Sequence, residues 1–234
     1  MNQSILAILF DLDGTLLDSN MENFIPHYFQ ALSARVAHLM PPKEFVVQLM
    51  RATEAMMAND GTATNEQVFA NAFYPLLGHN RAELEPIFDD FYAYDFPDLR
   101  KYTSRKPEAR PLVQRAFDLG YDVVIATNPL FPRTATQQRL EWAGVADFPY
   151  SLVTSYENSR ACKPNLRYFD LVCEHIGRAP AECLVVGDEA MDMVAARVGC
   201  LTFLVPGPAT ALNASVPEPA YRGTLSDVMA LIER

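Results

Sequence analysis

The feature that most constrains the fold is an apolar run near the N-terminus that leads directly into two aspartates. Residues 5–10 read Ile-Leu-Ala-Ile-Leu-Phe, and Asp11-Leu12-Asp13-Gly14-Thr15 follows. A short, uniformly apolar run is typical of a strand buried on both faces of a parallel sheet. Gly14 tolerates the sharp turn that must follow. The pattern predicts two carboxylates at the carboxyl end of a buried strand, where open α/β sheets bind ligands. The simpler alternative is an Asp-Gly turn that only ends the strand.

Strands and helices alternate in the second half of the sequence. From residue 105 onward, short apolar runs alternate with stretches of helical periodicity that end at glycines such as Gly120 and Gly144. This alternation predicts an α/β fold with a doubly wound, Rossmann-like parallel sheet. We expect strands at 121–126, 150–154, 183–186 and 201–205, helices at 107–119, 133–143, 164–176, 190–198 and 225–234, and a loop over 206–223.

A long stretch with helical periodicity and no strand signal separates the first strand from this alternating part. Four amphipathic helices are predicted here, and two of them begin with the capping-box pairs Thr64 with Gln67 and Asn80 with Glu83. Helices that interrupt a sheet in this way indicate an inserted domain. We therefore predict an α/β core domain formed by residues 1–17 and 105–234, and an all-helical cap domain formed by residues 18–104.

The composition limits the partners and the compartment. The chain of 234 residues has a formal net charge of −10, which disfavours nucleic acids and anionic membrane surfaces because both require basic patches. No apolar stretch reaches transmembrane length, and the N-terminus lacks the basic region of a signal peptide. The four cysteines show no Cys-x-x-Cys spacing, so neither a zinc site nor a disulfide framework is indicated. We expect a cytoplasmic location.

Three further stretches place polar side chains after predicted strands or before a predicted helix. Thr127 and Asn128 follow one strand, where a hydroxyl and backbone N–H groups are available to phosphate, although this is also an ordinary turn sequence. Lys163 precedes a helix whose N-terminus favours anions, but a solvated surface lysine is the alternative. Asp188 and Asp192 lie one helical turn apart and suit a hard cation such as Mg²⁺, although Asp188 also fits an N-cap. In a parallel sheet these stretches are expected to converge on one edge.

The order and spacing of the four stretches resemble the four motifs of the haloacid dehalogenase-like hydrolase superfamily, most of whose members are phosphatases. The resemblance covers roughly residues 5–20 and 105–205, and the helical insert resembles, by position and helix content, the cap that this superfamily places after the first strand.

The resemblance implies a catalytic role for four side chains. Asp11 looks like the nucleophile that becomes a phosphoaspartate, and Asp13 looks like the general acid and base. Thr127 resembles the residue that orients the phosphoryl group, and Lys163 is similar to the lysine that neutralises its charge. We expect Thr127, Asn128 and Lys163 to contact the substrate phosphate.

The resemblance also implies Mg²⁺ as the cofactor. The implied ligands are the carboxylates of Asp11 and Asp188 and the backbone carbonyl of Asp13. Gly14 and Asp192 are expected in supporting positions, with Asp192 next to the catalytic lysine or to the waters of the metal. Physically, the ion and the lysine would place positive charge where the phosphoryl oxygens carry negative charge.

These observations predict a Mg²⁺-dependent phosphatase that acts on a small phosphorylated metabolite, as a monomer or homodimer. Glu189 departs from the small hydroxyl residue common at its position, and Cys162 stands where a small residue is common.

A phosphomutase and a 2-haloacid dehalogenase are alternatives, and Asp13 argues against the second. A phosphonate hydrolase would need a cap lysine, and residues 20–92 hold only Lys43. A non-catalytic binding protein on the same fold remains the alternative from another class.

Overall fold

A parallel sheet forms the centre of the molecule, and it confirms the predicted α/β fold. The computed structural model describes residues 4–208 and 210–234. The strands of the sheet are β1 (Ala7–Phe10), β4 (Asp122–Ile125), β5 (Leu152–Val153), β6 (Cys183–Gly187), β7 (Leu201–Leu204) and β8 (Tyr221–Arg222). They hydrogen-bond in the order β5-β4-β1-β6-β7-β8, and every neighbouring pair is parallel. The strand order runs outward in both directions from β1, as expected of a doubly wound sheet.

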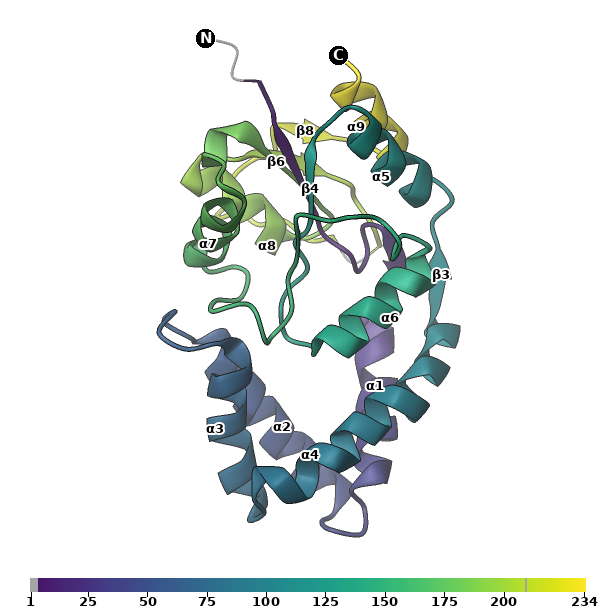
Figure 1. The fold of residues 1–234 in the computed structure, drawn as a ribbon, viewed down its shortest axis with the longest axis vertical. Helices are drawn as coiled ribbons and strands as arrows, with labels where there is room; N and C mark the ends of the chain where they lie inside the picture. The colour runs from purple at the N-terminus through teal and green to yellow at the C-terminus, as the bar shows by residue number, and fades with distance from the viewer. Residues whose placement is uncertain (1–3, 209) are drawn as a thin grey trace.

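Helices cover both faces of this sheet because alternate side chains of a strand point to opposite faces. The helices of this part are α5 (Ala109–Asp118), α6 (Arg133–Ala143), α7 (Leu166–Ile176), α8 (Ala190–Met193), which continues as a 3-10 helix (Val194–Val198), and α9 (Leu225–Ile232). Ile8 and Phe10 of β1 belong to the same apolar cluster as residues of α5 and α9. Ala7 and Leu9 belong instead to a second cluster with residues of α7. Figure 1 shows α5 and α9 on one side of the strands and α7 on the other.

The long insert consists of four α-helices, as the periodicity predicted. They are α1 (Met21–Arg35), α2 (Pro42–Met57), α3 (Asn65–Leu77) and α4 (Arg81–Asp90), followed by a π-helical turn (Phe91–Asp95) and a 3-10 helix (Phe96–Tyr102). Both predicted capping boxes are present, at Thr64 with Gln67 and at Asn80 with Glu83. In Figure 1 these helices gather at one end of the molecule, below the sheet. That residues 18–104 form a domain of their own remains a proposal.

Three short strands were not predicted. β2 (Leu17–Ser19) and β3 (Thr103–Arg105) pair antiparallel where the chain enters and leaves the insert, so this boundary is not purely helical. Asp18 lies opposite Ser104 in their register. β8 lies within residues 206–223, for which we predicted a loop. Two or three residues are too few to show a period in the sequence, and such strands depend on the neighbour with which they pair. Helix α7 also begins later than predicted, with Asn165 as its N-cap and Pro164 outside it.

Aromatic side chains join the insert to the rest of the chain. Phe96 stacks on Trp142 of α6 with ring centroids 5.3 Å apart, and Phe24 of α1 meets the edge of Phe96 at 6.1 Å. This packing fixes α6, which carries a buried arginine described below. No helix in the described part of the chain is both long and apolar enough to cross a bilayer.

Candidate active site

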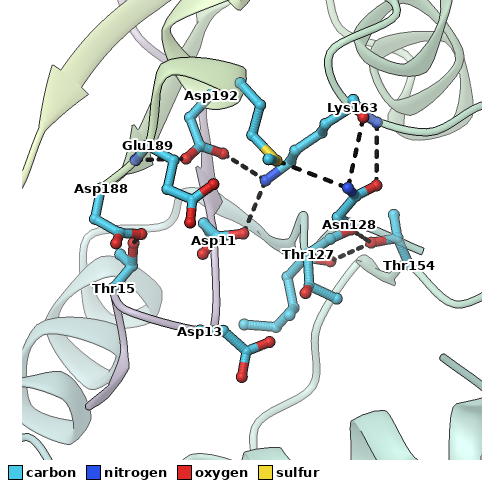
Figure 2. Close-up of polar contacts among 12 residues, drawn as sticks. Asp11, Asp13, Thr15, Thr127, Asn128, Thr154, Lys163, Asp188, Glu189 and Asp192 are labelled. Atoms are coloured by element: carbon cyan, nitrogen blue, oxygen red, sulfur yellow. Dashed lines mark hydrogen bonds and ion pairs between the residues drawn. The ribbon is translucent and has the colours of Figure 1, made fainter. Parts of the chain in front are cut away.

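The predicted site residues of the sheet edge come together because three neighbouring strands end there. Asp11 follows β1, Thr127 follows β4 after one residue, and Asp188 follows β6. β4 and β6 flank β1, so the parallel order brings these three side chains to one edge. Lys163 reaches the same place from the loop before α7. Figure 2 shows its ammonium between Asp11 and Asp192.

Lys163 is the centre of a buried charge cluster. Its Nζ donates to Asp11 Oδ1 at 2.8 Å and to Asp192 Oδ1 at 2.5 Å, and the side chain is 1% exposed. Burial by itself lowers the pKa of Lys163, but the charges of Asp11 and Asp192 outweigh it and hold the pKa well above its usual range. Burial raises the pKa of Asp192 to about 6, although Lys163 partly offsets the effect. The ammonium is therefore a permanent positive charge beside the predicted nucleophile.

Asp188 is held by the residues that follow the first aspartate pair. Thr15 Oγ1 donates to Asp188 Oδ1 at 3.0 Å. Gly14 has a φ of +84°, and a Cβ at this position would lie 2.1 Å from Asp188 Oδ2. Only glycine fits such a close approach at a positive φ. Burial, with Asp11 and Asp192 adding negative charge nearby, raises the pKa of Asp188 to about 8. The glycine of the motif thus makes room for the carboxylate, and the threonine orients it.

Three carboxylates form the acidic group that suits a cation. Oxygens of Asp11, Asp188 and Asp192 all lie within 4.8 Å of one another. Both oxygens of Asp192 already accept hydrogen bonds, one from Lys163 and one from the backbone N–H of Glu189 at 3.2 Å. Asp11 and Asp188 are therefore the carboxylates of this group that remain for a metal. Their mutual repulsion in a buried site fits a hard divalent cation, which would neutralise both.

The carboxylate of Asp13 lies apart from this group, because a residue that the sequence analysis missed holds it. Arg139 Nη1 of α6 donates to Asp13 Oδ2, and Arg139 is itself 1% exposed. The guanidinium also donates to Thr136 and lies 4.6 Å from the centroid of the Phe131 ring. Burial raises the pKa of Asp13 to about 6 even though Arg139 lowers it. Asp13 Oδ1 is buried and has no partner among the described residues.

The two polar residues after β4 have different environments. The backbone carbonyl of Thr127 accepts from Thr154 Oγ1 at 2.7 Å and from the hydroxyl of Tyr168 at 3.0 Å. Asn128 instead uses its side-chain amide on Lys163, with Oδ1 accepting from the Lys163 backbone N–H at 3.1 Å. We expected Asn128 to contact phosphate. In the structure its side-chain oxygen helps to hold the lysine loop, and the contact with phosphate stays a prediction.

The two residues that depart from the expected pattern are both buried or half-buried. Cys162 is 1% exposed, and its Sγ lies 3.3 Å from the Nδ2 of Asn65 in α3. Burial raises the pKa of the Cys162 thiol to about 12, so it stays protonated. Burial and the charge of Asp11 raise the pKa of Glu189. Cys162 is therefore a small, buried side chain whose thiol stays protonated.

Several residues of the site carried little signal in the sequence. Arg139 had the clearest, since it falls on the same helical face as Ala135, Thr136 and Ala143, all of which are buried. A charged residue on an apolar helix face requires a partner. Thr154 and Tyr168 offered no such pattern, because their contacts depend on how distant segments pack.

Known proteins share this architecture. A family model described as haloacid dehalogenase-like hydrolase matches residues 5–199. A phosphoglycolate phosphatase of Vibrio vulnificus (strain CMCP6) is 28% identical over 205 residues, which cover 86% of this chain and 83% of that protein. The pyrophosphatase PpaX of Bacillus velezensis is 24% identical, over 84% of this chain and 80% of its own.

Solved structures agree on the fold. A HAD phosphatase from Thermococcus onnurineus superimposes with a TM-score of 0.64 at 18% identity, covering 97% of this chain and 98% of that one. A dehalogenase crystallised as an intermediate complex gives a TM-score of 0.61 at 19% identity, with both chains covered completely. At these identities the likeness concerns the fold alone, so the choice between phosphatase and dehalogenase rests on the residues of the site.

Proposed function

This protein belongs to the haloacid dehalogenase-like hydrolase family, and from that premise we propose that it is a magnesium-dependent phosphatase that hydrolyses a small phosphorylated metabolite through a phosphoaspartate. The observation that carries the proposal is the pair of unlike carboxylates on one turn. Asp11 contacts Lys163, whereas Asp13 lies in a separate, largely buried position with a pKa raised to about 6. Two carboxylates with different environments suit a nucleophile and a general acid.

In the first step, a carboxylate oxygen of Asp11 attacks the phosphorus of the substrate. A bond from Asp11 to phosphorus forms while the bond from phosphorus to the alcohol oxygen breaks. Lys163 lies 2.8 Å from Asp11 Oδ1, so its charge offsets the repulsion between the Asp11 carboxylate and the anionic phosphoryl oxygens that approach it. Asp13, in its protonated form, gives its proton to the departing alcohol. The unpartnered Asp13 Oδ1 is the atom free to carry that proton.

In the second step, Asp13 accepts a proton from water. The resulting hydroxide attacks the phosphorus, releases phosphate and restores the Asp11 carboxylate. A group that acts as an acid and then as a base works best with a pKa near the working pH, and the raised pKa of Asp13 fits this requirement.

The carboxylates of Asp11 and Asp188 and the backbone carbonyl of Asp13 would hold Mg²⁺. The ion, when bound, supplies positive charge that offsets the charge of the phosphoryl oxygens. Thr15 and Gly14 fix Asp188 for this role, and Asp192 holds Lys163 rather than the metal.

A second acid argues against a dehalogenase. Displacement of a halide by a carboxylate releases an anion that needs no protonation, so that step does not call for a general acid such as Asp13. A non-catalytic binding protein would have no use for a lysine buried between two carboxylates, which is costly to maintain.

Leaving-group dependence tests the proposal. Asp13→Asn should slow hydrolysis of an alkyl phosphate at least about 100-fold, because an alkoxide leaves poorly without a proton. The first step with an aryl phosphate should be much less affected, and the phosphoryl group should then accumulate on Asp11, where mass spectrometry of the intact protein after rapid quenching detects it.

Two controls complete this experiment. Excess chelator should abolish turnover of both esters, and Mg²⁺ should restore it. Asp11→Asn should show neither turnover nor labelling. Equal slowing of alkyl and aryl esters by Asp13→Asn, with unchanged affinity for Mg²⁺, would make Asp13 a structural residue and refute its acid–base role.

A further inference from the structure

A cavity of about 300 Å³ lies between helices of the insert and the segment that follows β4. Its walls come from α1, α2, α3, α4, Tyr92, residues 130–134 and residues 156–157, and they are rich in aromatic side chains. A mainly apolar hollow of this size with a few polar groups is typical of a small-molecule site. The aromatic side chains that line it include Tyr28, Phe69, Phe73, Phe88, Tyr92 and Phe131.

The cavity lies on the Asp13 side of the catalytic cluster. Phe131 lines the cavity, and the guanidinium that pairs with Asp13 rests 4.6 Å from the centroid of this ring. One side chain, Arg139, thus touches both the general acid and the cavity wall. Asp13 donates its proton to the alcohol oxygen, so the alcohol part of the substrate must lie on this side. A second hollow is lined by Asp188 and Glu189 and lies instead beside the proposed metal ligands.

Two tyrosines give the cavity a free hydrogen-bond donor. The hydroxyls of Tyr28 and Tyr92 lie 2.9 Å apart, and within the described residues each contacts only the other. Such a pair has two O–H groups, and one of them suffices for the shared hydrogen bond. The remaining O–H is available to an acceptor atom of a ligand. Either oxygen can be the donor of the shared bond, so the free O–H belongs to Tyr28 or to Tyr92. Tyr28 is 6% exposed and Tyr92 is half-buried, so leaving a donor unused here would be costly in the absence of a ligand or water.

The charges around the cavity are mostly negative. Glu66, Glu85, Asp89 and Glu157 line it, against the single guanidinium of Arg81. Arg81 is already paired with Glu66 at 2.5 Å and with Glu85 at 2.7 Å. Asp89 and Glu157 therefore leave an excess of negative charge, which repels a second anion such as a carboxylate.

We propose that this cavity binds the alcohol part of the substrate, so that the preferred substrates are phosphate monoesters of an aromatic or bulky apolar alcohol without negative charge. The inference rests on the proposed phosphatase function. It predicts a different substrate from that of its phosphoglycolate phosphatase relatives, because the alcohol released from phosphoglycolate carries a carboxylate. The aromatic walls supply the affinity, the tyrosine pair orients an oxygen or nitrogen of the ligand, and the acidic residues exclude anions.

The test compares three phosphate monoesters of alkyl alcohols: 2-phenylethyl phosphate, ethyl phosphate and 2-phosphoglycolate. None carries an activated leaving group, so differences in kcat/KM with Mg²⁺ present report mainly on recognition. Burial of a phenyl ring should raise kcat/KM for 2-phenylethyl phosphate at least about 10-fold above that for ethyl phosphate. 2-Phosphoglycolate should be hydrolysed least well.

A matched pair of variants locates the preference in the cavity. Ala70 lines the cavity, whereas Asn71 on the same helix is exposed. Ala70→Phe fills the hollow and should lower the ratio of kcat/KM for 2-phenylethyl over ethyl phosphate about 10-fold, whereas Asn71→Phe should leave that ratio unchanged. Circular dichroism checks that both variants fold. The comparison of esters with the unmodified protein stands even if Ala70→Phe does not fold.

The outcomes distinguish the inference from the proposed function. Absence of turnover with these three esters and also with the aryl phosphate of the leaving-group experiment, all with Mg²⁺ present, would count against the phosphatase function itself. Hydrolysis in which 2-phosphoglycolate equals or exceeds 2-phenylethyl phosphate would leave the function standing and overturn the inference. A preference for the phenyl ester that Ala70→Phe and Asn71→Phe affect alike would also overturn it, because the selectivity would then arise outside the cavity.

Discussion

Lys163 at the edge of the sheet and Phe73 in the helical insert are both about 1% exposed, but their surroundings differ in kind. Lys163 lies between two carboxylates, at 2.8 and 2.5 Å. Phe73 lies among aromatic rings, with centroid distances of 4.8 Å to Phe69, 5.7 Å to Phe88 and 5.8 Å to Phe45.

The difference separates function from stability. Burying charges costs free energy that their pairing only partly returns, so a cluster of one ammonium and several carboxylates is weak evidence for stability. Aromatic burial is favourable in itself. The sheet edge is therefore the part of the molecule shaped by chemistry, and the aromatic insert is shaped by packing and by the cavity that the packing leaves.

The largest expected effect comes from removing the nucleophile. Asp11→Asn should lower kcat/KM with any phosphate ester at least about 10⁴-fold, equivalent to about 5.5 kcal/mol, because the covalent step is lost. This loss should not come from unfolding, so the melting temperature of the variant should stay close to that of the unmodified protein. Turnover above about 1% of the original rate would show that the sheet edge does not perform the chemistry in the way proposed here.

The next largest effect falls on stability and activity together. Lys163→Met leaves Asp11 and Asp192 buried without their cation, which should lower the free energy of unfolding by about 3–5 kcal/mol and abolish turnover. Urea denaturation followed by circular dichroism measures the change. Lys43→Met, at an exposed position in α2, is the matched control and should change neither property. A stable, active Lys163→Met protein would contradict the contrast between the two clusters.

A large-to-small change in the insert should affect stability locally. Phe73→Ala removes a ring from a packed aromatic cluster, at a cost of about 3–5 kcal/mol. If residues 18–104 form a separate domain, hydrogen exchange should accelerate across α2, α3 and α4 while β1, β4 and β6 stay protected. Phe169→Ala in α7, equally buried beneath the sheet, should reverse that pattern. Uniform acceleration in both variants would mean that the chain opens as one unit.

The smallest effect concerns an exposed ion pair, which serves as the baseline for the buried charges. Arg110 donates to Asp147 at 2.6 Å and lowers the pKa of Asp147 to about 2. A carboxyl whose pKa is lower in the folded than in the unfolded chain stabilises the fold at pH values above its unfolded pKa, which is about 4. This contribution disappears as the pH falls toward 2, the approximate pKa in the folded state. Solvent screens the pair, so Asp147→Asn should shift the melting temperature by less than about 2 °C at pH 7. Differential scanning calorimetry measures the change in melting temperature at pH 7 and again at pH 3. A decrease of more than about 2 °C at pH 7 would mean that this exposed pair contributes to stability as a buried ion pair does.

Local patterns predicted much of this molecule. The apolar run before Asp11 became β1, the period of 133–143 became α6 with the same bounds, and the capping pair Thr64 with Gln67 opens α3. These features depend on neighbours within about four residues, and periodicity and turn chemistry report on that range. The convergence of Asp11, Thr127 and Asp188 was also predictable, because parallel strands end at one edge.

Only the tertiary structure decided the contacts between segments that lie far apart in the sequence, because no local sequence pattern connects them. Arg139 and Asp13 are 126 positions apart, and their pairing requires α6 to be held in place by the aromatic rings of the insert. β2 and β3 are strands only because each lies beside the other. The hydrogen bond from the Lys163 backbone N–H to the Asn128 side chain joins two loops 35 positions apart, because an amide takes whichever partner the fold brings within about 3 Å. The sequence by itself determined which groups are available for catalysis, and packing determined which of them are paired with one another and which are left for the substrate.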